Sequence, residues 1–219
     1  MTASALVPKP RVERAPRRAA LAPLIGRDDD IGRVAAAFES GARVVTLSGP
    51  PGIGKTRAAL ACLERLAPRF AETGGAWFCD LSHVTSDGGL GLAVLSLLRD
   101  RRGGEVARAD EARARVGDVL EAAGPALLVL DNFEQLVSAA AVVERWCEAA
   151  PELWVLVTSR ERLAVAGEVV VELAPLDESA AAQLFVKRAR DAGGAQAYEP
   201  AAVASIVRKL EGIPLAIEL

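Results

Sequence analysis

The stretch Gly49-Pro50-Pro51-Gly52-Ile53-Gly54-Lys55-Thr56 decides the fold, because it fits the pattern G-x-x-x-x-G-K-[ST]. The β-branched run 44–48 before it has the composition of a short buried strand, and the Ala- and Leu-rich run 57–66 after it places apolar residues on one helical face. A strand, this loop and a helix in that order form the phosphate-binding unit called a P-loop. The order separates this stretch from a glycine-rich turn that binds nothing.

Each residue type in the loop suits phosphate binding. Glycine at positions 49, 52 and 54 lets backbone N–H groups point inward and leaves room for phosphate oxygens. Lys55 places a positive charge on the β- and γ-phosphates, Thr56 offers a hydroxyl to Mg2+, and the following helix adds the positive end of its dipole. We expect the nucleotide to contact Gly49, Pro50, Pro51, Gly52, Ile53, Gly54, Lys55, Thr56 and Arg57.

Length and composition bound the class of protein. The 219 residues suffice for one α/β domain with a large core, and the 51% hydrophobic and 25% charged fractions are ordinary for a globular protein. The apolar runs are much shorter than the roughly 18 residues that suggest a membrane span, and no secretory signal is recognisable. Cys62, Cys79 and Cys147 have no C-x-x-C spacing, which is typical of reduced core cysteines. We expect a cytoplasmic protein without membrane contact.

The net charge of −3 hides an asymmetry between the two parts of the chain. Residues 1–22 contain five basic residues and one acidic residue, a balance of +4, which leaves −7 for residues 23–219. Binding along nucleic acid needs clustered Lys and Arg, so the acidic body argues against a broad DNA-binding surface. The basic segment could touch nucleic acid or a membrane, but a short flexible tail is the favoured interpretation.

A second motif follows at a distance that suits the first. The apolar run 126–130 leads into Asp131, which is the Walker B form: a buried strand delivers a carboxylate beside the P-loop, where it helps to hold Mg2+. An aspartate at a strand end can also cap a helix, and here Asp131 or Asn132 could cap a helix whose buried face runs from Phe133 to Cys147. The preceding P-loop favours the metal site.

Two further residues are candidates for the chemistry of hydrolysis. Asn132 cannot be a strong base, so Glu134 is the candidate for the group that activates water; its alternative is a first-turn glutamate favoured by the helix dipole. Arg160 follows the buried strand 153–158, at the carboxyl edge of the sheet where ligands bind, and could reach the γ-phosphate. Its alternative is a surface arginine paired with Glu161 or Glu168.

The pattern of segments predicts a three-layer α/β/α fold of the P-loop NTPase class, with a parallel five-stranded sheet followed by a small helical subdomain. We expect a flexible basic tail over residues 1–22, a nucleotide-binding core over 23–176 and the start of a helical subdomain over 177–219. The chain stops within an apolar helical pattern, so we expect that it is a fragment of a longer protein.

With these landmarks, the chain resembles the nucleotide-binding domain of the signal-transduction ATPases with numerous domains (STAND), in particular the NB-ARC-like modules of bacterial transcriptional regulators of the AfsR and LuxR types. The resemblance covers about residues 23–219. Its motifs are Leu-Ile-Gly-Arg at 24–27, Gly-Pro-Pro-Gly-Ile-Gly-Lys-Thr at 49–56, Leu-Val-Leu-Asp-Asn-Phe-Glu at 128–134, Thr-Ser-Arg at 158–160, Leu-Ala-Pro-Leu at 173–176 and Gly-Ile-Pro-Leu-Ala-Ile-Glu-Leu at 212–219.

The resemblance implies roles for individual residues. Ile25, Gly26 and Arg27 would flank the adenine, Arg160 would sense the γ-phosphate, and Pro214 would pack near the base or ribose. The residue after Asp131 departs from the paired acids of many members, which leaves the base open. The family's winged-helix domain and its repeat or DNA-binding domains are not among these residues, so we expect DNA contact only through domains that this chain does not contain.

Together these features predict a nucleotide-dependent switch that binds ATP or ADP with Mg2+, hydrolyses ATP slowly and self-associates in the ATP state. Lys55, Glu134 and Arg160 are its expected catalytic residues, and Thr56 and Asp131 its expected metal ligands. One alternative is an AAA+ DNA-loading ATPase of the origin-recognition kind, against which the acidic body argues. Another is a P-loop kinase, but no substrate or lid element is recognisable between the two motifs.

Overall fold

The computed structural model describes residues 24–99, 109–193 and 198–219. Its centre is one sheet of five parallel strands in the order β2-β3-β4-β1-β5. The strands are β1 Val44–Ser48, β2 Gly75–Asp80, β3 Ala126–Asp131, β4 Leu153–Ser159 and β5 Glu168–Glu172. This confirms the predicted five-stranded parallel sheet. β4 lies between β1 and β3, so the P-loop and Asp131 follow strands that are not neighbours.

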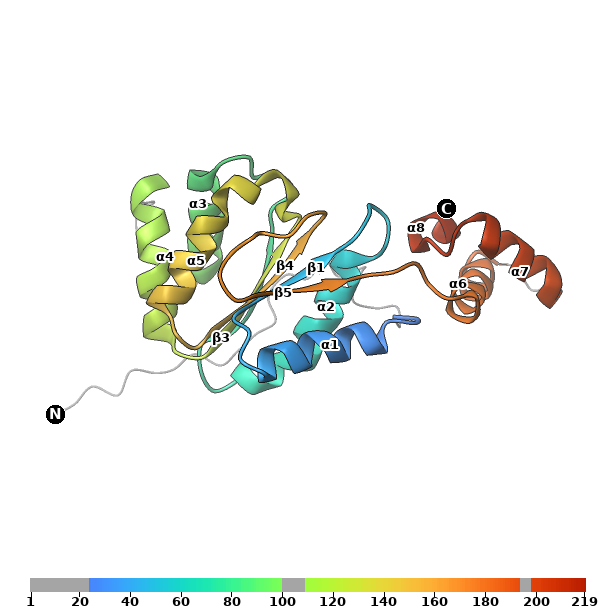
Figure 1. The fold of residues 1–219 in the computed structure, drawn as a ribbon, viewed down its shortest axis with the longest axis horizontal. Helices are drawn as coiled ribbons and strands as arrows, with labels where there is room; N and C mark the ends of the chain where they lie inside the picture. The colour runs from blue at the N-terminus through green and yellow to red at the C-terminus, as the bar shows by residue number, and fades with distance from the viewer. Residues whose placement is uncertain (1–23, 100–108, 194–197) are drawn as a thin grey trace.

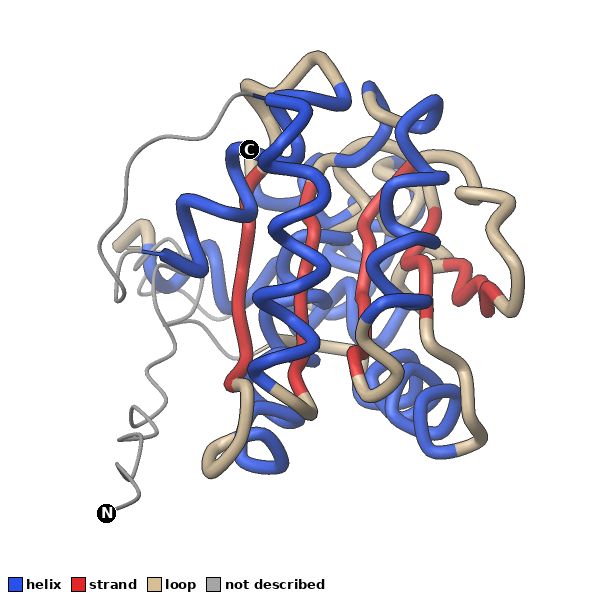
Figure 2. Tube along the Cα trace, turned by 90° about the vertical axis from the view of Figure 1, so that its left-hand side faces the viewer, coloured by secondary structure: helices blue, strands red, loops and turns tan. Residues whose placement is uncertain are grey.

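Helices cover both faces of the sheet, as predicted for a three-layer fold (Figures 1 and 2). The helices of this part are α1 Asp28–Glu39, α2 Lys55–Leu66, α3 Asp87–Arg99, α4 Ala109–Ala123 and α5 Ala140–Ala149, with a short 3-10 helix at Ala67–Phe70. α1 and α2 pack with one set of strand side chains, and α3, α4 and α5 pack with the other set. The strands β1 and β3 are buried along their whole length, which is why their sequences are almost wholly apolar.

The segment after Asp131 differs from the predicted continuous helix. Two 3-10 turns, Phe133–Gln135 and Val137–Ala139, precede α5, which begins only at Ala140. Asn132 has a left-handed backbone with a φ of 64°, and its side chain makes no capping hydrogen bond. Phe133, Leu136, Ala140 and Val143 of the predicted buried face are buried, whereas Val137 and Cys147 are half-buried. The apolar spacing could not show that a left-handed residue changes the direction of the chain at Asn132.

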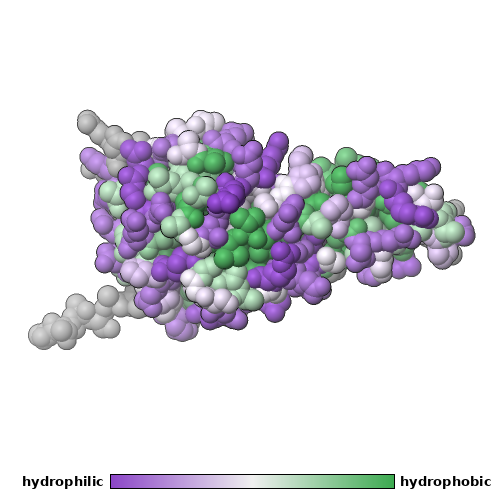
Figure 3. Space-filling view, in the orientation of Figure 1, coloured by the Kyte–Doolittle hydropathy of each residue, from purple (hydrophilic) through white to green (hydrophobic). Residues whose placement is uncertain are grey.

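Three further helices form a separate lobe: α6 Glu178–Asp191, α7 Pro200–Lys209 and α8 Pro214–Glu218. They have a hydrophobic cluster of their own, made of Leu176, Ala180, Ala181, Leu184, Val203, Val207 and Ile217. In Figure 3 this helical lobe projects from the α/β core as a narrower extension. The segment 173–176 follows β5, and the first helix of the lobe begins at Glu178.

No helix in the described ranges 24–99, 109–193 and 198–219 is both long and apolar enough to cross a bilayer.

Candidate nucleotide-binding site

The P-loop joins the end of β1 to the start of α2. Gly49, Gly52 and Gly54 have φ values of 146°, 79° and 98°, a region that side chains other than glycine rarely adopt. A Cβ atom at position 49 would also lie 3.1 Å from the carbonyl oxygen of Leu173. No side chain caps the first turn of α2, so its backbone N–H groups face the loop without a side-chain acceptor. The loop therefore fits a phosphate group.

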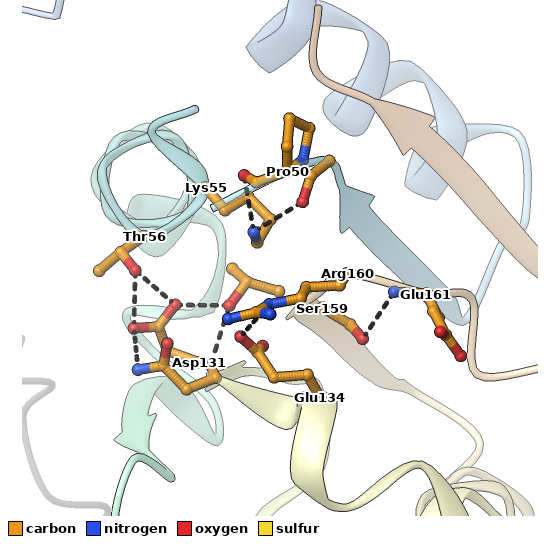
Figure 4. A network of polar contacts seen from close by, with 11 residues as sticks. Pro50, Lys55, Thr56, Asp131, Glu134, Ser159, Arg160 and Glu161 are labelled. Atoms are coloured by element: carbon orange, nitrogen blue, oxygen red, sulfur yellow. Dashed lines mark hydrogen bonds and ion pairs between the residues drawn. The ribbon is translucent and has the colours of Figure 1, made fainter. Parts of the chain in front are cut away.

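Lys55 lies over the loop at the first residue of α2. Its Nζ donates hydrogen bonds to the carbonyl oxygens of Gly49, at 2.8 Å, and Pro50, at 3.2 Å (Figure 4). Burial lowers the pKa of Lys55, and the nearby Glu134 carboxylate opposes that effect. The ammonium group is thus held beside the loop by two hydrogen bonds, and its third N–H can donate to a phosphate oxygen.

Thr56 and Asp131 meet as the two motifs predicted. The Thr56 hydroxyl lies 3.0 Å from each carboxylate oxygen of Asp131, whose side chain is only 2% exposed. Burial raises the pKa of Asp131, while hydrogen bonds from Thr158 and Thr56 lower it. Mg2+ typically takes one or two protein oxygens together with substrate phosphates, so this pair beside the P-loop fits Mg2+. The alternative of Asp131 as a helix cap is wrong, because its carboxylate faces Thr56 and Thr158 instead.

Glu134 and Arg160 form an ion pair in front of this pair of residues (Figure 4). The Nε atom of Arg160 lies 3.3 Å from Oε1 of Glu134, and the described residues offer no hydrogen-bond partner to the buried Oε2 atom. Arg160 therefore pairs with neither Glu161 nor Glu168, the partners that its alternative interpretation predicted. Glu134 lies in a three-residue 3-10 turn, so its alternative as a first-turn residue of a long helix is also wrong.

The segment Ile25-Gly26-Arg27 lies between the P-loop and the helical lobe. Arg27 is 5% exposed, and its guanidinium donates to the carbonyl oxygens of Ile53, at 2.9 Å, and Ala174, at 2.7 Å. A Cβ atom at Gly26 would come within 2.5 Å of the Ala180 side chain. Arg27 thus supports the back of the P-loop through bonds to protein atoms, and adenine contact by this segment stays a prediction.

The helical lobe reaches the P-loop directly. The backbone N–H of Leu215 donates to the carbonyl oxygen of Gly52 at 3.1 Å, and Pro214 is the nearest side chain to a Cβ atom built at Gly54, at 4.0 Å. Leu215 remains 50% exposed although it lies on the loop. Pro214 therefore lies beside the phosphate loop, and its expected contact with the base or ribose stays a prediction. Leu215 is a neighbour that the motif did not single out.

Glu218 ties the lobe to the helix that follows the P-loop. Its Oε1 atom accepts from Arg57 at 2.7 Å and its Oε2 atom from Arg188 at 2.9 Å. Arg57 is in α2, Arg188 in α6 and Glu218 in α8, so one carboxylate joins three elements. Arg57, predicted to bind nucleotide, thus has this carboxylate as a partner, and no spacing in the sequence could have indicated the bond.

Replacing Glu218 by Gln is expected to loosen α8 from the P-loop. The ion pairs are partly exposed, so after discounting for solvent screening the loss is about 1 kcal/mol, or roughly 2–4 °C in Tm. Hydrogen exchange at the Leu215 amide should become faster. The matched control is Glu178→Gln, whose exposed pair with Arg208 is 3.7 Å long and should leave both measurements unchanged. Equal effects of the two variants would contradict a special role of Glu218.

Residues 23–210 match the family of the AAA ATPase domain. The chain belongs to this family. This AAA ATPase domain is 36% identical over 182 residues to an uncharacterized protein of Mycobacterium tuberculosis, covering 81% of this chain and 44% of the relative. It is 38% identical over 185 residues to a second protein of that organism, whose name describes an HTH-type transcriptional regulator. This match covers 80% of this chain and 20% of the relative. The chain spans less than half of the length of both relatives.

Solved structures share the fold of this AAA ATPase domain. The Walker-type ATPase of Pyrococcus abyssi matches with a TM-score of 0.63 at 15% identity, over 89% of this chain and 66% of that one. A STAND protein with a tetratricopeptide repeat sensor from Pyrococcus horikoshii matches with a TM-score of 0.56 at 20% identity, over 99% and 31%. Drosophila ORC bound to DNA matches with a TM-score of 0.64 at 15% identity, over 92% of this chain and 57% of that one. At these identities the likeness describes the fold alone.

Proposed function

We propose that this AAA ATPase domain is an ATP- and ADP-binding switch of the STAND kind, with slow Mg2+-dependent hydrolysis. The observation that carries the proposal is the contact between the helical lobe and the P-loop, through Leu215 on Gly52 and Pro214 beside Gly54. Because the same loop is the phosphate cradle, a bound nucleotide and the position of the lobe are physically linked. We expect the lobe to have a second position, away from the P-loop. A nucleotide that binds one of the two arrangements more tightly will shift the protein toward that arrangement.

The roles of the site residues follow from their positions. The P-loop N–H groups and Lys55 would bind the β- and γ-phosphates, and Thr56 and Asp131 would hold Mg2+, which neutralises developing charge when bound. Glu134 presents an unpartnered carboxylate oxygen that could accept a proton from water. Arg160 is exposed beside Glu134, so its guanidinium could turn to a γ-phosphate. Loss of that phosphate would release Arg160 and favour the other lobe position.

The charge of the chain and its relatives bear on partners. The body carries −7 outside residues 1–22, which disfavours DNA binding along its surface. This chain spans a fifth of the relative named as a transcriptional regulator. We therefore propose that any contact with DNA belongs to other parts of a longer protein, and that the ATP state favours self-association. The origin-recognition alternative shares the fold and predicts salt-sensitive DNA binding by this domain instead.

The switch is tested by measuring the position of the lobe in each nucleotide state. Spin labels at Glu72→Cys on the core and Lys209→Cys on α7 both occupy exposed positions. The native Cys62 and Cys79 are buried, and the half-buried Cys147 is replaced by Ala in the labelled protein. Double electron–electron resonance should give different distance distributions with ADP and with a non-hydrolysable ATP analogue. Calorimetry on the same labelled protein confirms that each nucleotide binds. Identical distributions with both nucleotides bound would contradict the switch.

A further inference from the structure

The ends of β3 and β4 are joined by the buried hydroxyl of Thr158, a residue of the motif at 158–160 in which only Arg160 was given a role. Thr158, at 1% exposure, donates from Oγ1 to Oδ1 of Asp131 at 2.6 Å. The same Oγ1 atom accepts the backbone N–H of Asn132 at 2.9 Å. A threonine hydroxyl has one proton, so donation to Asp131 leaves its lone pairs for Asn132. The hydroxyl therefore has one defined orientation.

These two bonds act on the two halves of the site. The bond to Asp131 fixes the carboxylate that faces Thr56, where Mg2+ fits. The bond to Asn132 holds the residue whose left-handed backbone, with a φ of 64°, turns the chain toward Glu134. A residue other than glycine is strained in this conformation, so the surrounding structure must hold it there. One hydroxyl thus supports both the metal ligand and the turn that carries the candidate base.

We propose that Thr158 is a positioning residue that aims the Asp131 carboxylate at Mg2+ and fixes the turn leading to Glu134. The inference rests on the proposed binding of a nucleotide with Mg2+. Groups that hydrogen-bond to a metal ligand orient it, and their loss typically weakens metal binding by about 10–100-fold. In the proposed site Thr158 acts through Asp131, because its hydroxyl donates its one proton to that carboxylate.

Thr46 is a second buried threonine whose hydroxyl donates to a carboxylate, and it offers a comparison with Thr158. It lies on β1, is fully buried, and donates from Oγ1 to Oε1 of Glu168 at 2.7 Å. Glu168 in turn accepts the backbone N–H groups of Leu163 and Ala164, so this bond braces a loop next to β5. Thr46→Val is therefore a matched control: it removes a buried hydroxyl that is bonded to a carboxylate, away from the metal residues.

The experiment compares ADP affinity by calorimetry in EDTA and over a range of Mg2+ concentrations. Thr158→Val should raise the Mg2+ concentration for the half-maximal effect by about 10-fold or more, with the affinity in EDTA unchanged. Thr158→Ser keeps the hydroxyl and should restore the wild-type Mg2+ response. Thr46→Val should lower Tm without altering that response. A wild-type Mg2+ response in Thr158→Val, with or without a lowered Tm, would overturn the proposal.

Two further outcomes are distinguishable. If Thr158→Val does not fold, Thr158→Ala, which removes the hydroxyl without adding a second methyl group to a buried site, carries the same comparison and the same expected direction of shift. If the wild-type protein binds no nucleotide in EDTA or in Mg2+, the proposed function fails before the role of Thr158 is reached. An equal Mg2+ shift in Thr46→Val would mean that general loosening of the sheet is the cause, and would also overturn the assignment.

Discussion

Replacing Lys55 by Ala is expected to lower the affinity for ATP at least about 100-fold and that for ADP at least about 10-fold. Hydrogen bonds to charged groups each contribute about 1.5–3 kcal/mol, and Lys55 would contact the β- and γ-phosphates of ATP but only the β-phosphate of ADP. Within the loop the Lys55 ammonium group donates to the carbonyl oxygens of Gly49 and Pro50, and its removal takes away no backbone–backbone hydrogen bond. Calorimetry measures the affinity directly.

A second readout of Lys55→Ala is thermal stability. ATP at 100 times its Kd stabilises the wild-type protein by about 2.7 kcal/mol, and the variant should show almost none of this gain. The matched control is Lys187→Ala, which removes a lysine of α6 whose pair with Asp191 is 3.6 Å long. The control should bind as the wild type does. Unchanged affinity in Lys55→Ala would show that the P-loop assignment is wrong.

Replacing Glu134 by Gln is expected to preserve nucleotide binding and to slow hydrolysis by about 100-fold or more, the usual contribution of a general base. Glutamine has nearly the same shape and can still accept from Arg160, but its amide cannot take a proton from water. Phosphate release under single-turnover conditions measures the effect, because it separates the chemical step from product release.

The control for Glu134→Gln is Glu161→Gln, which changes an exposed acid next to Arg160 whose backbone N–H donates to the Ser159 hydroxyl. It should leave the rate unchanged. An unaltered rate in Glu134→Gln would remove Glu134 as the base. A loss of ATP affinity in Glu134→Gln that equals its loss of rate would instead place Glu134 in ground-state binding.

The ion pair between Arg160 and Glu134 links the roles proposed for these two residues. In this structure the Nε atom of Arg160 lies 3.3 Å from Oε1 of Glu134, so the guanidinium occupies one of the two carboxylate oxygens. If Arg160 turns to a γ-phosphate, the same motion frees Glu134. This arrangement agrees with a domain that hydrolyses ATP slowly and responds to whether the third phosphate is present.

The sequence predicted the parts of the site that depend on local pattern. The eight residues 49–56 and the apolar run into Asp131 each combine a strand with a loop whose chemistry is specific, so their roles could be inferred without a structure. The meeting of Thr56 and Asp131 followed from the parallel sheet, since strands of such a sheet deliver their ends to one edge. Periodicity was less reliable after Asp131, where a left-handed Asn132 replaced the expected helix start with 3-10 turns.

The sequence by itself determined the fold class and predicted the phosphate loop and the acidic residue for Mg2+, because these depend on residue type and spacing within one segment. Only the tertiary structure decided which distant groups act together: Arg160 with Glu134, Thr158 with Asp131 and Glu218 with Arg57. The physical reason is that hydrogen bonds and ion pairs depend on distances of about 3 Å. Such distances arise from the packing of whole elements, which no local pattern encodes.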